Sequence, residues 1–131
     1  MQQDLKDALL DRAELTALVG DRIDWNKRLQ GEGLPAIRLL RVSGGATYTL
    51  EGRRSFTDTV VQFDVYAETA TELAAVVAQV RQALDVLRGA HFRGAVIENE
   101  RDGTLTGDGP DGDGPSDLHR TSLDVRVWHY A

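Results

Sequence analysis

The sequence predicts one α+β domain spanning residues 1–131, with a mainly antiparallel sheet of four to five strands and two helices packed on one face. Residues 56–67 alternate apolar and polar side chains, which is typical of a strand with one covered face. Residues 70–88 carry apolar side chains at intervals of three and four, which is typical of an amphipathic helix. The short connections between the other strands favour hairpins and therefore antiparallel pairing.

The first part of the chain predicts a helix, a connector and a hairpin. Leucines with partial helical periodicity predict a helix over residues 4–18, and Gly20 is placed to end it. Polar residues and glycines make residues 21–35 a connector. A strand is expected over residues 36–42, with Ser43-Gly44-Gly45 breaking it. A short run then leads into Glu51-Gly52, a hairpin turn in which glycine accepts a positive φ.

The second part of the chain predicts a capped helix and two more strands. Thr69 and Glu72 form a capping box before the helix over residues 70–88, and Gly89 follows as its stop. Strands are expected from Phe92 to Glu100 and from His119 to Ala131, with Leu123, Val125 and Val127 on one face of the last strand. Between these strands lies a flexible loop rich in aspartate and glycine, at about residues 102–117.

The stretch Gly107 to Gly112, "GDGPDG", matches the G-x-G-x-x-G pattern of dinucleotide-binding loops. That site needs a helix that begins on the glycines, whereas "DGDGPSD" follows here. Pro110 removes a backbone donor, and Asp108 and Asp111 repel phosphate. The match is therefore accidental. The same aspartates leave weak calcium binding open, although their spacing is not that of an EF-hand.

Composition and motifs argue against several classes of function. The chain has no cysteine and a net charge of -6, which disfavours thiolate metal sites and DNA wrapping. No stretch approaches the ~20 apolar residues of a membrane span. The three histidines lack ligand spacing, and we expect His119 and His129 to face solvent or a subunit contact. The sequence predicts no enzyme, catalytic residue, cofactor or metal site.

The residues that favour a protein contact are an arginine pair, an acidic group and a tryptophan. Arginine binds carboxylates bidentately, and arginine and tryptophan are enriched at the energetic centres of interfaces. We expect the arginine pair to contact a partner through carboxylates. The candidate interface residues are Arg53, Arg54, Glu98, Glu100, Asp102 and Trp128.

The order of motifs along the chain resembles the tail completion or tail terminator family of long-tailed bacteriophages and gene transfer agents. The resemblance is carried by "ALVGDRI", "LPAIRLLRVSG", "YTLEG", "VVQFDVYAETATEL", "VRQALD" and "HRTSLDVRVWH", and covers about residues 5 to 129. The Asp/Gly loop is longer and richer in glycine than the family pattern.

The resemblance implies a virion protein made in the bacterial host cytoplasm and placed at the head–tail junction. It implies a homohexameric ring that ends growth of the tail tube. The implied partners are the tail tube protein and the head–tail connector or adaptor, with DNA only passing through the lumen. Two alternatives remain: a head-side connector adaptor, and a soluble ligand- or calcium-binding module that uses the acidic loop.

Overall fold

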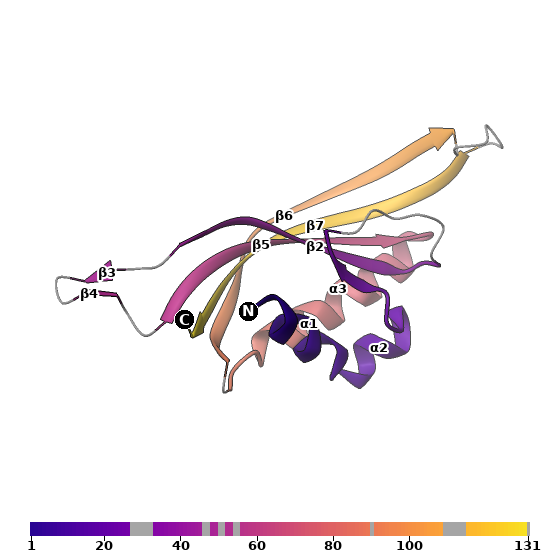
Figure 1. Ribbon diagram of the computed structural model, residues 1–131. Coiled ribbons are helices and arrows are strands. Elements are labelled where there is room, and N and C mark those ends of the chain that lie inside the picture. Colours follow the sequence, from indigo (N-terminus) through magenta and orange to yellow (C-terminus); the bar gives the residue numbers. More distant parts are fainter. Residues whose placement is uncertain are drawn as a thin grey trace.

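Three helices lie against one face of a five-stranded sheet, which confirms the predicted α+β class (Figure 1). No helix in the described part of the chain covers the opposite face, which we call the open face. The computed structural model describes residues 1–26, 33–45, 48–49, 52–53, 56–89, 91–108 and 115–130.

The sheet has the strand order β1-β2-β5-β7-β6. All neighbours are antiparallel except β1 and β2, which are parallel. Two short strands, β3 and β4, pair with each other in a separate two-stranded sheet. The bounds are β1 Ile23–Trp25, β2 Ala36–Gly45, β3 Tyr48–Thr49, β4 Gly52–Arg53, β5 Phe56–Ala67, β6 Phe92–Asp108 and β7 Pro115–Tyr130.

The first predicted helix is two helices, α1 (Gln2–Leu10) and α2 (Ala13–Val19). Arg12 has an extended backbone at the start of α2. The break has a packing reason: in one continuous helix Leu15 would point about 240° around the axis from Leu9, at about 100° per residue. The break allows both leucines to be buried. Gly20 ends α2 with φ 61°, as the sequence predicts.

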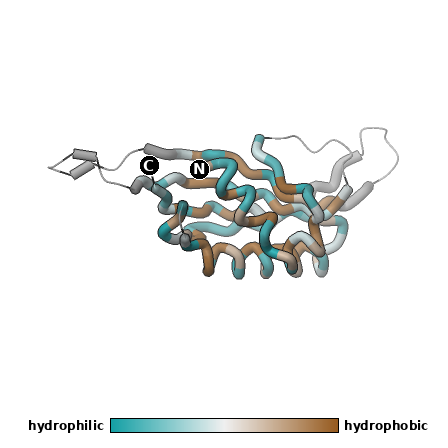
Figure 2. Tube along the Cα trace, turned by 60° about the horizontal axis from the view of Figure 1, so that its bottom comes forward, coloured by the Kyte–Doolittle hydropathy of each residue, from teal (hydrophilic) through white to brown (hydrophobic). Residues whose placement is uncertain are grey.

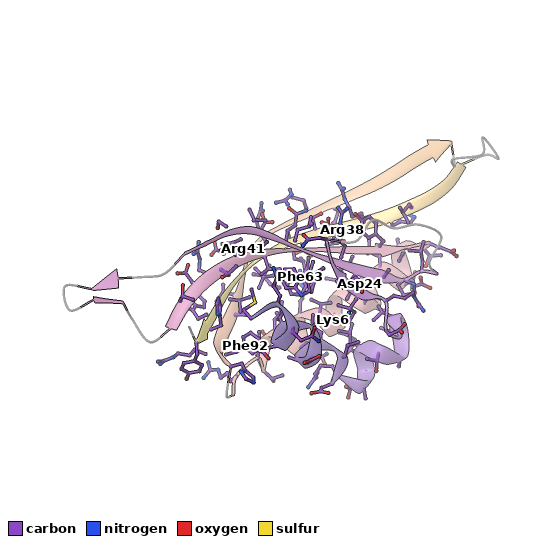
Figure 3. The ribbon with its side chains drawn as sticks, in the orientation of Figure 1. Lys6, Asp24, Arg38, Arg41, Phe63 and Phe92 are labelled. Atoms are coloured by element: carbon purple, nitrogen blue, oxygen red, sulfur yellow. The ribbon has the colours of Figure 1, made fainter. Side chains whose placement is uncertain are left out.

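The core lies between the helices and the inner face of the sheet. Phe63 of β5 is fully buried at its centre, between the sheet and the helices (Figure 3). The third helix, α3 (Ala70–Asp85), begins where the Thr69 hydroxyl accepts a hydrogen bond from the Glu72 amide. Apolar and polar positions alternate along the strands in Figure 2. The predicted apolar stripe of α3 is buried: Leu73, Val76, Val77, Val80, Leu84 and, just beyond the helix, Leu87.

Strand β5 has the predicted bounds, whereas β2 is longer than predicted. The chain stays in β2 through Gly45 because a bulge between Arg41 and Ser43 absorbs the irregularity, so the predicted break at 43–45 was wrong. Gly52 belongs to β4, and Glu51 of the predicted turn lies outside the described residues.

Strands β6 and β7 continue as a paired arm well beyond the predicted strand ends (Figure 1). Pairing runs to Asp108 and Pro115, so much of the predicted 102–117 loop is strand. Established pairing in the sheet overrides the low strand propensity of glycine and aspartate. Residues 109–114 lie outside the described residues. A strand follows at Pro115, where a dinucleotide site would need a helix.

Candidate functional site

The predicted interface residues fall on different parts of the fold. Arg53 lies in β4, and Arg54 lies outside the described residues. Trp128 is half-buried on the open face, where β7 pairs it with Asp58 of β5 and Gly94 of β6. Two predicted acids, Glu98 and Glu100, lie on opposite faces of β6, as their contacts show.

Glu98 belongs to an ion cluster on the open face. Arg126 of β7 donates from Nε to Glu98 and from Nη1 to Asp58 of β5. One guanidinium therefore joins three adjacent strands through two carboxylates. These charge-assisted hydrogen bonds raise the pKa of Arg126, and the bond to Glu98 contributes most to the rise.

A second cluster on the open face surrounds Asp64, which is fully buried although no helix covers it. Its carboxylate accepts hydrogen bonds from Arg38 at 2.7 Å, Gln62 at 2.8 Å and Ser122 at 2.7 Å. Burial works to raise the pKa of Asp64, but these hydrogen bonds outweigh it and hold the pKa below its ordinary value. The Arg38 guanidinium also lies 5.8 Å from the centre of the Tyr66 ring.

A third pair, Arg101 and Asp124, completes the charged face. Arg101 donates to both carboxylate oxygens of Asp124, at 2.7 and 3.2 Å. These three groups place three arginines beside four carboxylates. Each of these three arginines bonds a carboxylate of the same chain, so none of the three is a free cation for phosphate. Sequence reasoning missed these pairs because each partner lies on a different strand.

Glu100 and Asp102 line a groove on the helical side of the sheet. Arg81 of α3 forms an ion pair with Glu100, and the Thr121 hydroxyl donates to Asp102 at 2.8 Å. The groove has a volume of about 650 Å³ and is open to solvent. Its other lining residues are Ala70, Leu73, Ala74, Val77, Ala78, Gly103, His119 and Arg120.

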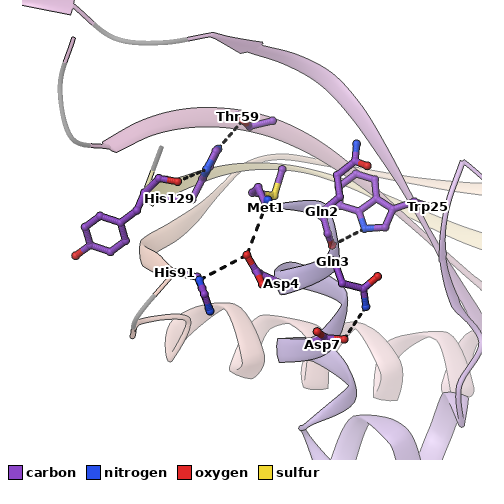
Figure 4. A network of polar contacts seen from close by, with 10 residues as sticks. Met1, Gln2, Gln3, Asp4, Asp7, Trp25, Thr59, His91 and His129 are labelled. Carbon is purple, nitrogen blue, oxygen red and sulfur yellow. Dashed lines mark hydrogen bonds and ion pairs between the residues drawn. The ribbon is translucent and has the colours of Figure 1, made fainter. Parts of the chain in front are cut away.

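His129 does not face solvent or an open contact, so that prediction was wrong. It is buried at the end of β7, with Nε2 2.8 Å from the Thr59 hydroxyl and Nδ1 3.3 Å from the Tyr130 carbonyl oxygen (Figure 4). Its position on the inner face follows the alternation of Val125 and Val127. Burial lowers the pKa of His129 below its ordinary value.

The described residues hold neither a cluster of metal ligands nor a membrane-spanning helix. Within those ranges, no three histidine, aspartate or glutamate side chains gather as a metal site would need. None of the helices among them has the length and hydropathy to cross a bilayer.

Two comparisons with known proteins show what the chain is similar to. A family model described as "Tail completion protein gp17" matches residues 3–130. A solved chain described as "Virion of native gene transfer agent (GTA) particle" has a TM-score of 0.69 with this fold. The match covers 95% of this chain and 90% of that chain at 16% sequence identity, which shows a shared fold. A search of curated proteins gave no match.

Proposed function

The chain belongs to the tail completion protein gp17 family and is a structural protein of a phage or gene transfer agent tail, and we propose that it terminates the tail tube. In this proposal it forms a homohexameric ring at the head-proximal end of the tube. The ring ends tube polymerisation and joins the tail to the head connector. The observation that carries the proposal is the family match over residues 3–130, which spans the described helices and strands except the first residue of α1.

The proposed ring binds two other proteins, and DNA passes through it. The tail tube protein lies on one side and the head–tail connector or adaptor on the other. DNA crosses the lumen without being held, which is supported by the net charge of -6 and by the arginine–carboxylate pairs of the open face. The role is assembly rather than catalysis.

Subunits of such a ring meet through heterologous contacts, in which one patch meets a different patch. We assign one patch to Arg53 and Arg54 and the other to Glu100 and Asp102 of the neighbour. Glu98 and Trp128 belong to a separate contact on the open face. Reversing both arginines to glutamate should reduce ring formation, and unchanged assembly would count against this pairing.

Deleting the gene and imaging the particles by electron microscopy tests the proposed role. Tails of uncontrolled length, or completed tails beside unjoined filled heads, are the expected result. Tails of normal length beside filled heads that lack an adaptor would instead support the alternative role, that of a head-side connector adaptor. Normal particles would overturn the assignment to assembly. A calcium titration of the whole protein tests the binding-module alternative, which tight saturable binding would favour.

A further inference from the structure

We propose that the groove between α3 and the outer edge of β6 receives the β3–β4 hairpin of a second copy of this chain, which extends the sheet. The inference rests on the ring proposed above and names the contact that would close it. Two features meet at this place: an unpaired strand edge and an adjoining groove.

The strand edge is the outer side of β6. Within the described part of the chain β6 pairs only with β7, and from Asn99 to Asp108 this register is unbroken. Backbone N–H and C=O groups on such an edge form a template for another strand. The opposite edge, β1, has three residues and is held to α1 through a hydrogen bond from Trp25 Nε1 to the Gln2 carbonyl oxygen at 2.9 Å.

The groove provides space for the side chains of the added strand. Alternate side chains of a strand on this edge would point toward α3, because successive side chains in a strand face opposite ways. On α3, Ala70, Ala74 and Ala78 are exposed and short, and Leu73 and Val77 form an apolar floor beneath them. A strand edge beside a helix is the arrangement that binds extended segments by adding a strand.

The β3–β4 hairpin is the occupant that the fold itself offers. Among the described residues its two strands pair only with each other, and an isolated two-stranded hairpin is at best marginally stable in water. In Figure 1 it projects from one end of the sheet, whereas the start of α3, whose residues line the groove, lies at the other end. The hairpin and the groove thus lie at opposite ends of one copy, and in this proposal the contact joins two copies.

Charge is complementary between the two parts. Arg53 lies in the hairpin, and Glu100 and Asp102 line the groove. Arg81 already pairs with Glu100, whereas Thr121 contributes only a neutral hydroxyl to Asp102. Of these two carboxylates, Asp102 is therefore the one that an arginine from a neighbouring copy would stabilise more. Because hairpin and groove are different surfaces, each copy can bind one neighbour through its hairpin and another through its groove, which is the heterologous type of contact from which rings are built.

Cysteine crosslinking in assembled particles tests the contact, since the chain has no cysteine of its own. We expect Thr49→Cys combined with Ala74→Cys to give a ladder of multimers, up to the closed ring, with a short bis-maleimide. The matched control combines Thr49→Cys with Gln82→Cys, an exposed position of α3 outside the groove, and should give no ladder. Ala74→Trp fills the groove and should reduce completed particles at least tenfold while the purified chain stays folded.

The outcomes separate this inference from the proposed function. A ladder confined to the groove pair supports the inference. No ladder, or a dimer alone, in particles that carry the protein at the head-proximal end of the tail would overturn the hairpin contact and leave the terminator role standing. Particles that assemble normally without the protein would overturn the terminator role, and the ring contact with it.

Discussion

Replacing Asp64 by alanine tests how strongly the buried carboxylate of the open face stabilises the sheet. Ser122 is 3% exposed, so its hydroxyl loses a partner that water cannot replace, at a cost of about 1–2 kcal/mol. The Arg38 side chain is 27% exposed and regains some hydration, so its loss is also about 1–2 kcal/mol, below that of a fully buried pair. The sum is about 3 kcal/mol, equivalent to a fall in Tm of about 11 °C for a chain of this length.

Thermal melting followed by circular dichroism and urea unfolding measure this loss. Asp124→Ala is the matched control, because it removes an arginine–carboxylate pair from the same face where both side chains are more exposed, 24% for Asp124 and 46% for Arg101. An exposed pair contributes little to stability, because solvent screens the two charges. If the two variants lose the same small free energy, the buried carboxylate does not stabilise the sheet as reasoned here.

Three further perturbations test the buried histidine, a helix cap and a glycine. Burial holds the pKa of His129 below its ordinary value of 6.5, so this side chain binds a proton more strongly in the unfolded chain than in the folded chain. The free energy of unfolding should therefore fall as pH drops below about 6.5, and His129→Gln should flatten that slope in urea titrations at several pH values. Thr69→Ala should cost about 1 kcal/mol by removing the cap of α3, whereas Thr69→Asn should retain most of it; urea unfolding measures both. Gly20→Ala should cost about 1–2 kcal/mol because φ is 61° there, and Gly33→Ala, where φ is not in that region, should cost less in the same assay.

The sequence predicted best those elements whose pattern repeats over a long stretch. Strand β5 and helix α3 each bury one face over at least twelve residues, so a single periodicity locates them. Strand β1 has three residues, too few for any period, and its parallel pairing with β2 depends on a partner distant in sequence. The arm of β6 and β7 was missed because its local composition favours turns, whereas its structure is determined by the pairing of β6 with β7.

The predicted acidic patch was divided by a single inserted residue. Glu98, Glu100 and Asp102 are spaced by two, so a regular strand would place all three on one face. The register between β6 and β7 shifts between Ile97 and Asn99, which leaves Glu98 as the extra residue of a bulge. Glu98 then bonds Arg126 on the open face, while Glu100 and Asp102 turn to the helical side.

This division follows from backbone pairing rather than from side-chain preference. Shifting a strand by one residue exchanges its faces, and no local pattern marks where a bulge will form. The bulge moves two acids from a face crowded with arginine pairs to a groove with an open strand edge. Deleting Glu98 should remove the bulge but leave Asn99 opposite Asp124 and Glu100 opposite Leu123, so Glu100 and Asp102 should stay on the helical side. Crosslinking between the β3–β4 hairpin and the groove should therefore persist in the deleted chain, because the charges that complement Arg53 still line the groove. Loss of crosslinking in a deleted chain that still folds would contradict this reading of the bulge.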